Sequence, residues 1–172
     1  MVLIGLGANL RSSNYGAPRR TLTAALAALA DEGIAVAACS AWYESAPQPP
    51  SNQPWYVNAV AALLTEIDPF ALLAALQRVE RRFGRTRGAR NTARTVDLDL
   101  LDHDGVEVET ATLVLPHPRL HLRRFVLLPL AELAPDWRHP RCRLTAAQLL
   151  SGLTTPQPVY RLPLDTDDPP NG

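Results

Sequence analysis

The pattern of apolar and polar positions predicts three strands in the first part of the chain. Residues 2–7 form a short apolar run, which is typical of a buried strand, and residues 34–43 and 55–67 indicate two more. The Pro-rich stretch 45–54 between the second and third strands cannot form a helix or a central strand and is predicted to be a loop. If this loop closes a long hairpin, the two strands are antiparallel.

Two segments carry apolar side chains at helical spacing. Pro18 opens the first segment, which ends near Gly33. Asp68 supplies an N-cap acceptor for the second segment, Pro69 occupies its first helical position, and Gly84 ends it. The apolar stripe of this helix leaves a polar face formed by Gln77, Glu80 and Arg81.

A further strand is predicted at "ARTVDLDLL", residues 93–101, and Asp104-Gly105 indicates a turn between short strands. Residues 126–135 predict a short helix interrupted by Pro129. The order strand–helix–strand–strand–helix–strand favours an α+β fold, with a ferredoxin-like antiparallel sheet and helices packed on it. We expect one domain over residues 1–154 and a Pro/Asp-rich tail over 155–172, in which "VYRLPL" could add an edge strand. Such a fold does not decide function.

Composition excludes several classes of protein. No apolar run reaches the roughly 18 residues of a membrane span, and the N-terminus lacks the features of a signal peptide. Cys39 and Cys142 have no metal-ligand or redox spacing, so a cytoplasmic protein is expected. The 17 basic residues are all arginine. This excludes a lysine Schiff base and the lysine of a P-loop.

The basic charge is concentrated beside a pair of acids. Residues 78–94 carry seven Arg against Glu80 alone, which gives +6. In a strand, Asp97 and Asp99 point to the same side, roughly 6.5–7 Å apart, while Val96, Leu98 and Leu100 face the core. The two carboxylates could bracket two Mg²⁺ ions that take further ligands from substrate phosphates. Alternatively, both aspartates form salt bridges with the nearby arginines.

A second group of residues suits a flat ligand. Asn58 offers both a donor and an acceptor to the edge of a heteroaromatic ring, and Tyr56 lies on the same side of the predicted strand. Phe125 could stack on such a ring. His117 and His121 suggest a metal pair, but Pro118 disfavours the helix that would align them, so zinc is not expected.

Several motifs together are similar to one family. They are "LIGLGANL", "YESAPQ", "NQPWYVNAV", "LQRVERRFGR", "ARTVDLDLL" and "LPHPRLHLRRFVLLPLAELAP". The sequence resembles the 6-hydroxymethyl-7,8-dihydropterin pyrophosphokinases of the folate pathway over residues 2 to about 153. The resemblance implies transfer of pyrophosphate from ATP to the hydroxymethyl group of the pterin, with release of AMP. It also implies two Mg²⁺ ions, a monomer, and no nucleic-acid or membrane partner.

The resemblance also implies roles for individual residues. The metal ions would be held by Asp97 and Asp99, which together with Arg85 and Arg94 form the catalytic set. The ATP site would comprise Gln77, Glu80, Arg87, Leu100, His117 and Arg123. The pterin pocket would comprise Ser45, Ala46, Tyr56, Asn58 and Phe125, with Tyr56 and Phe125 as stacking partners.

Two other functions are compatible with parts of this pattern. An RNA-binding module on a ferredoxin-like sheet would combine a basic total with aromatics on adjacent strands, whereas the net charge is zero and the aromatic fraction is 6%. A different magnesium-dependent phosphotransferase or nuclease could use the same acid pair. Formation of AMP from ATP only in the presence of the pterin would separate these functions.

Overall fold

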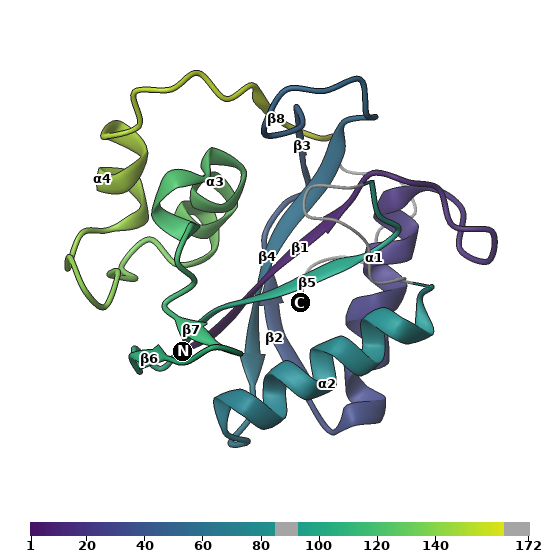
Figure 1. The fold of residues 1–172 in the computed structure, drawn as a ribbon, viewed down its shortest axis with the longest axis horizontal. Coiled ribbons are helices and arrows are strands. Elements are labelled where there is room, and N and C mark those ends of the chain that lie inside the picture. Colours follow the sequence, from purple (N-terminus) through teal and green to yellow (C-terminus); the bar gives the residue numbers. More distant parts are fainter. Residues whose placement is uncertain (85–92, 164–172) are drawn as a thin grey trace.

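The computed structural model describes residues 1–84 and 93–163, which form a six-stranded sheet flanked by helices (Figure 1). All strand pairs in this sheet are antiparallel. The strand order is β5-β1-β4-β3-β8, and β2 also pairs with β4. The strands are β1 (Val2–Ala8), β2 (Ala35–Cys39), β3 (Tyr43–Ser45), β4 (Tyr56–Leu64), β5 (Asp97–His103) and β8 (Val159–Arg161).

Helices cover both faces of the sheet. The first face carries α1 (Pro18–Ala27), its continuation η1 (Ala28–Glu32) and α2 (Pro69–Arg82). The second face carries α3 (Arg124–Leu133) and α4 (Ala146–Ser151). A small two-stranded sheet, β6 (Val108–Glu109) with β7 (Val114–Leu115), and the turn η2 (Leu120–Leu122) connect β5 to α3. The predicted α+β fold with an antiparallel sheet is confirmed.

The predicted helix boundaries are confirmed because the capping residues act as expected. The Asp68 carboxylate accepts hydrogen bonds from the backbone N–H groups of Phe70 and Ala71. Gly33 and Gly84 adopt left-handed φ values of 74° and 80° just beyond η1 and α2. The expected edge strand in "VYRLPL" is also present, as β8.

The predicted turn at Asp104-Gly105 is present between β5 and β6, and β6 pairs with β7. Two other local predictions need correction. The expected strand 34–43 is divided into β2 and β3, which pair with opposite halves of β4. The helix expected in 126–135 begins earlier, at Arg124, and runs through Pro129 without a break, although this proline lies in the second turn and cannot donate a backbone hydrogen bond.

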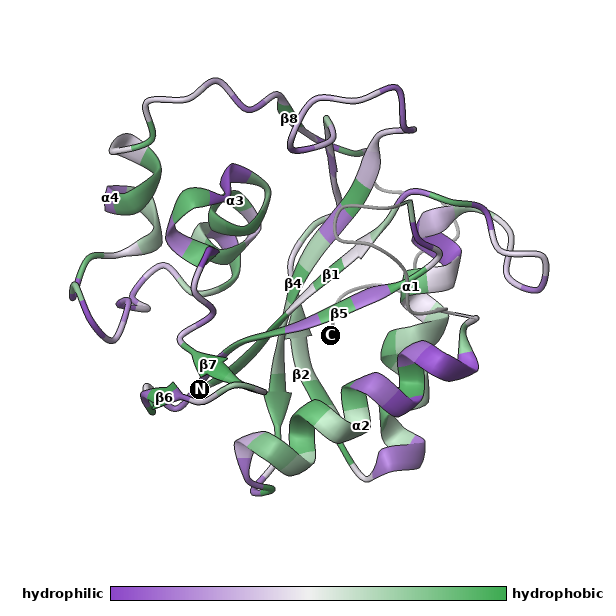
Figure 2. Ribbon diagram, in the orientation of Figure 1, coloured by the Kyte–Doolittle hydropathy of each residue, from purple (hydrophilic) through white to green (hydrophobic). Residues whose placement is uncertain are grey.

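The second face of the sheet is only partly covered. Beneath α3, the apolar side chains of Leu3, Val60 and Leu101 complete a second core. Further along the same strands, glycine, asparagine and aspartate replace the apolar residues, and Figure 2 shows the resulting hydrophilic stretch in β5. The open, polar half of this face is where the candidate site lies.

Across residues 1–84 and 93–163, no helix has the length and apolar character needed to cross a lipid bilayer.

Candidate active site

Three adjacent strands form the floor of the site. In the register of the sheet, Gly5 and Gly7 of β1 lie opposite Asp99 and Asp97 of β5, and Gly7 also lies opposite Asn58 of β4. A Cβ atom at Gly7 would stand 3.5 Å from the Asn58 Oδ1 atom, within the space above the floor. Without side chains, the two glycines therefore leave open space above the central strand, between its two polar neighbours.

Above this floor is an open cavity with an empty volume of about 890 Å³, part of which is open to solvent. Its walls come from the 45–53 loop, from β5 and from the start of α3. All five residues assigned to the pterin lie in its lining: Ser45, Ala46, Tyr56, Asn58 and Phe125. The lining also includes the predicted charged residues Arg94, Asp97, Asp99 and Arg123.

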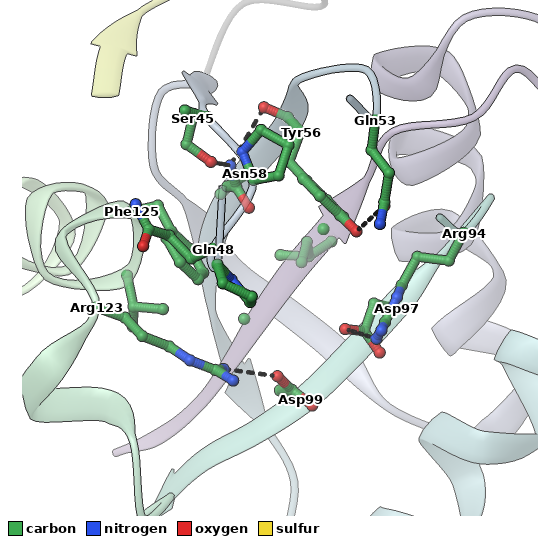
Figure 3. Close-up of a pocket in the computed structure, with 18 of the residues that line it drawn as sticks. Ser45, Gln48, Gln53, Tyr56, Asn58, Arg94, Asp97, Asp99, Arg123 and Phe125 are labelled. Carbon is green, nitrogen blue, oxygen red and sulfur yellow. Dashed lines mark hydrogen bonds and ion pairs between the residues drawn. The ribbon is translucent and has the colours of Figure 1, made fainter. Parts of the chain in front are cut away.

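One half of the cavity is aromatic and amide in character. Asn58 is 4% exposed, and its side-chain N–H donates to the Ser45 hydroxyl oxygen at 2.9 Å. The Tyr56 hydroxyl donates to the Gln53 side-chain oxygen at 3.2 Å. Burial raises the pKa of Tyr56, and the nearby Asp97 carboxylate adds to the rise. Tyr56 and Phe125 both face this half of the cavity (Figure 3).

The other half is charged. The Arg94 guanidinium contacts the Asp97 carboxylate at 2.5 Å, and the Arg123 guanidinium contacts the Asp99 carboxylate at 3.3 Å. Arg123 also lies 5.6 Å from the centre of the Phe125 ring, so it joins the two halves. Burial lowers the pKa of Arg123 from its ordinary value, which still leaves the side chain cationic at neutral pH. Salt-bridged aspartates, one of the two interpretations of the acid pair, are therefore present in the structure.

Asn9 connects the charged half of the cavity to the Pro-rich loop. This residue is 4% exposed, and its side-chain oxygen accepts from the Arg94 backbone N–H at 2.8 Å. Its side-chain N–H group donates to the Pro54 carbonyl at 3.1 Å and to the Gln53 side-chain oxygen at 3.3 Å. One buried amide thus fixes Arg94 relative to the end of the Pro-rich loop.

A second cavity adjoins the first, and Asp99 lines both. Two predicted ATP-site residues, Leu100 and His117, lie in its lining. The remaining lining residues are Leu73, Leu98, Ala111, Thr112, Leu113, Val114 and Pro118. The two cavities together form a site that extends along the acid strand.

His117 is held in one orientation. Its Nδ1 atom accepts from the Arg119 backbone N–H at 3.1 Å, and its Nε2 atom lies 3.9 Å from the Asp99 carboxylate. Burial lowers the pKa of His117, although the Asp99 charge opposes this shift. Because Nδ1 accepts a hydrogen bond, the neutral form of the ring carries its proton on Nε2, toward Asp99.

The donor set suits magnesium better than zinc. Within the described part of the chain, no three His, Cys, Asp or Glu side chains gather into a metal-binding cluster. The carboxylates of Asp97 and Asp99 nevertheless share one cavity, and Mg²⁺ is commonly held by one or two carboxylates while water and substrate phosphates complete its shell. The residues present therefore fit Mg²⁺.

Not every predicted residue lies at the cavities. Glu80 is 5% exposed, and its carboxylate accepts from the Leu98 backbone N–H at 2.7 Å, so it anchors β5 between the two aspartates. Gln77 lies outside the lining of both cavities. Direct contact of these two side chains with ATP stays a prediction. Arg85 and Arg87 lie outside the described residues.

Part of the lining was not predicted from the sequence. Gly5 and Gly7 were recognisable as a break in the apolar pattern of a buried strand, and an inward-facing glycine often indicates close approach of a ligand. Gln48 and Gln53 lie in the predicted loop, but no periodicity shows which loop residues face a cavity. Residues 111–114 gave no signal at all.

The fold and the cleft define an α+β protein whose site sets two carboxylates and two arginines beside an aromatic pocket. Residues 3–135 match the family model of 7,8-dihydro-6-hydroxymethylpterin-pyrophosphokinase. The chain belongs to this family.

Individual proteins support the same assignment. A 2-amino-4-hydroxy-6-hydroxymethyldihydropteridine pyrophosphokinase of Synechocystis sp. is 42% identical over 149 residues, which cover 86% of this chain and 73% of the relative. A protein of the same name from Pseudomonas aeruginosa is 42% identical over 140 residues, covering 81% and 83%. The crystal structure of a Plasmodium falciparum HPPK-DHPS triple mutant with SDX-DHP matches with a TM-score of 0.66 and 14% identity, over 87% of this chain and 43% of that chain. The likeness to the Plasmodium structure concerns the fold alone.

Proposed function

We propose that the chain transfers the pyrophosphoryl group of ATP to the hydroxymethyl group of 6-hydroxymethyl-7,8-dihydropterin and releases AMP. The observation that carries this proposal is the continuity of the cleft. An aromatic and amide pocket opens directly onto a row of two aspartates and two arginines, and a second cavity begins at Asp99. This is the arrangement required to bring a flat ring and a polyphosphate together. Membership of the family supports the same reaction.

The pterin is assigned to the half of the cavity that contains Tyr56, Asn58 and Phe125. The amide N–H groups of Asn58 donate to the Ser45 hydroxyl and the Tyr56 carbonyl, so its Oδ1 atom is preset as an acceptor for the edge of a heteroaromatic ring. The ring faces of Tyr56 and Phe125 would stack on the ligand. A prearranged pocket reduces the entropy lost when the substrate binds.

ATP is assigned to the second cavity, with its phosphates crossing Asp99 into the first. Leu73, Leu98 and Leu113 give that cavity an apolar lining suited to a base. Arg94 and Arg123 would then supply charge-assisted donors to phosphate oxygens near the acid pair. His117 presents its Nε2 atom toward the same place.

The residues proposed to hold magnesium are Asp97 and Asp99. When bound, Mg²⁺ would offset the charge of the triphosphate and help to orient it. In the reaction, the pterin hydroxymethyl oxygen forms a bond to the β-phosphorus, the bond from that phosphorus to the α,β-bridging oxygen breaks, and AMP leaves. The chain contributes by fixing both substrates in line and by placing arginines where negative charge shifts. No described side chain is assigned as a general base.

The working unit is proposed to be a monomer, as the resemblance to the pyrophosphokinases implies. Light scattering coupled to size-exclusion chromatography in the presence of both substrates measures this directly. A dimer under assay conditions would contradict the proposal.

AMP formation tests the function. The chain is incubated with ATP and Mg²⁺, with and without the hydroxymethyl-dihydropterin, and the expected result is AMP only when the pterin is present. Formation of AMP without the pterin would indicate another phosphotransferase, and no AMP in either reaction would reject the proposal. Asp99→Ala is expected to abolish turnover and Mg²⁺-dependent ATP binding while the fold stays intact. The exposed Asp136 provides the matched control, Asp136→Ala, which should retain activity.

A further inference from the structure

The segment that follows the last helix runs back to the pterin half of the cleft. It lies beyond residues 3–135, the part that the family model matches. Within it, β8 pairs with β3 along the edge of the sheet, and Val159 lies opposite Ser45 in the register. Figure 1 shows this strand in yellow beside β3, far from α4. A segment near the end of the described chain therefore borders a wall of the candidate substrate pocket.

Gln157, two residues before β8, caps helix α3 from a distance in sequence. The helix begins after Arg123, whose own side chain makes no capping hydrogen bond. The first N–H groups of a helix have no partner within the helix. The side-chain oxygen of Gln157 accepts from the backbone N–H of Arg124 at 2.8 Å, and its side-chain N–H donates to the carbonyl of Leu122 at 2.8 Å.

The capped turn carries two residues of the cleft. Arg123 and Phe125 stand on either side of Arg124 and both line the first cavity. Gln157 bonds to the backbone immediately before and immediately after Arg123. Its two hydrogen bonds therefore restrain the direction in which this turn presents Arg123 and Phe125.

The same segment holds the opposite wall. The carbonyl of Pro158 accepts from the backbone N–H of Ala46 at 3.2 Å. The ring of Tyr160 stacks on Trp55 with centroids 5.9 Å apart and planes 10° apart. Ala46 and Trp55 stand at the two ends of the Pro-rich loop, so one short segment contacts both ends of the loop as well as the start of α3.

We propose that Gln157 is a positioning residue for the pterin. Through its two hydrogen bonds it sets the distance between the wall that carries Phe125 and the wall that carries Ser45 and Ala46. This inference rests on the proposed function and extends it to a part of the chain outside the family match. It assigns to Gln157 an effect mainly on the affinity for the pterin ring, because Phe125 lines the pterin half of the cleft and the second cavity, which would hold the base of ATP, contains none of these residues. Arg123, on the same turn, is assigned only to the phosphates, so the KM for ATP should change less.

The first variant is Gln157→Met, which keeps the length of the side chain and removes both hydrogen bonds. Loss of a helix cap of this kind is expected to raise the KM for the pterin about fivefold while the KM for ATP stays within about twofold. The matched control is Gln148→Met, since Gln148 caps α4, away from the cleft. The control is expected to lower thermal stability to a similar extent and to leave the KM for the pterin unchanged.

A second variant distinguishes positioning from simple loss of stability. Gln157→Glu loses the donor to Leu122, but it keeps the acceptor for the Arg124 N–H and places a negative charge at the N-terminus of α3, which is favourable, so a smaller rise in the KM for the pterin is expected, about twofold. The proposal is overturned if Gln157→Met has the wild-type KM for the pterin, if Gln148→Met raises this KM equally, or if Gln157→Met raises the KM values for the pterin and for ATP equally.

If Gln157→Met does not fold, Gln157→Glu is the test. A rise in its KM for the pterin without an equal rise for ATP supports the proposal, and an unchanged KM for the pterin overturns it.

The same assay separates the two levels of inference. If the wild type forms no AMP, the proposed function fails, and the role of Gln157 in pterin binding fails with it. If the wild type is active and the Gln157 variants bind the pterin as it does, only the role of Gln157 is rejected.

Discussion

Replacing Asn9 with alanine is expected to weaken both the fold and the reaction. Asn9 is buried, and its side-chain oxygen and N–H group serve three partners: Arg94, Pro54 and Gln53. Asn9→Ala removes all three hydrogen bonds. It also leaves the Arg94 N–H and the Pro54 carbonyl without the partner that the folded chain provides.

The size of the effect follows from the geometry. The bonds to Arg94 and Pro54, at 2.8 and 3.1 Å, are of ordinary strength, whereas the bond to Gln53, at 3.3 Å, is weaker. With a net contribution of about 1 kcal/mol for each of the first two and less for the third, and with an added cost for unsatisfied groups, the loss should be about 2–4 kcal/mol. Displacement of Arg94 from the acid pair should lower kcat about 10- to 100-fold.

Urea unfolding measures the loss of stability, and AMP formation at saturating substrates measures kcat. The matched control is Asn14→Ala, in the same loop but exposed, which should change the free energy of unfolding by less than about 0.5 kcal/mol. Asn9→Asp keeps the acceptor for Arg94 but directs a carboxylate at the Pro54 carbonyl, so it should be no more stable than Asn9→Ala. A loss below about 0.5 kcal/mol in Asn9→Ala would refute the reasoning that this amide holds the two loops together.

Three further predictions concern other parts of the molecule. Gly7→Ala should fold normally, since its Cβ would meet ordinary contacts at 3.5 Å or more, but should raise the KM for the pterin by filling the floor of the cleft; a wild-type KM would contradict this. Asp102→Asn should lower stability by about 1–3 kcal/mol in thermal unfolding. The two oxygens of Asp102 accept from the Trp137 Nε1–H at 2.7 Å and the Gly105 N–H at 3.1 Å, whereas the single side-chain oxygen of asparagine can replace only one of these acceptors. Unchanged stability would contradict a contribution from these two hydrogen bonds. Burial lowers the pKa of His139, so the folded state binds its proton more weakly than the unfolded state does, and stability should fall as the pH drops below about 6.5. In His139→Asn, which keeps an acceptor for the backbone but does not titrate, the free energy of unfolding in urea should fall less steeply between about pH 7.5 and 5 than in the wild type. The same pH dependence in both proteins would reject the role assigned to His139.

The parts of the fold that the sequence predicted are those with local causes. Asp68 and Pro69 define the start of α2 because an N-cap and a proline at the first helical position act within one turn. The alternation along β5 placed Asp97 and Asp99 on one face and Leu98 on the other for an equally local reason, namely the period of a strand. The capping box of Thr145 and Gln148 at α4 is a signal of the same kind, and its T-x-x-Q spacing is present in the sequence, but this helix was not predicted.

The parts that the sequence did not predict depend on contacts between distant segments. Nothing around Glu80 indicates that its carboxylate would be buried against the Leu98 N–H, because that contact arises only when α2 packs on β5. Nothing around Gln157 indicates that it would cap α3, because the cap forms only after β8 has paired with β3. Which loop residues face the cavity, Gln48 among them, depends on the path of the backbone, and a loop has no regular spacing from which that path could be predicted.

The two interpretations of the acid pair describe the same charges in two situations. In the structure, Asp97 is paired with Arg94 and Asp99 with Arg123, so each half-buried carboxylate has a cation beside it. A carboxylate pair that loses its cations is destabilised by repulsion, so the guanidinium groups can turn to phosphate oxygens only if another positive charge takes their place. Magnesium that arrives with ATP would supply that charge. Affinity for ATP without Mg²⁺ should therefore be low, because the phosphates and the aspartates would then compete for the same two arginines. Titration of ATP with and without Mg²⁺ measures this, and equal affinity in both conditions would contradict the proposed exchange of partners.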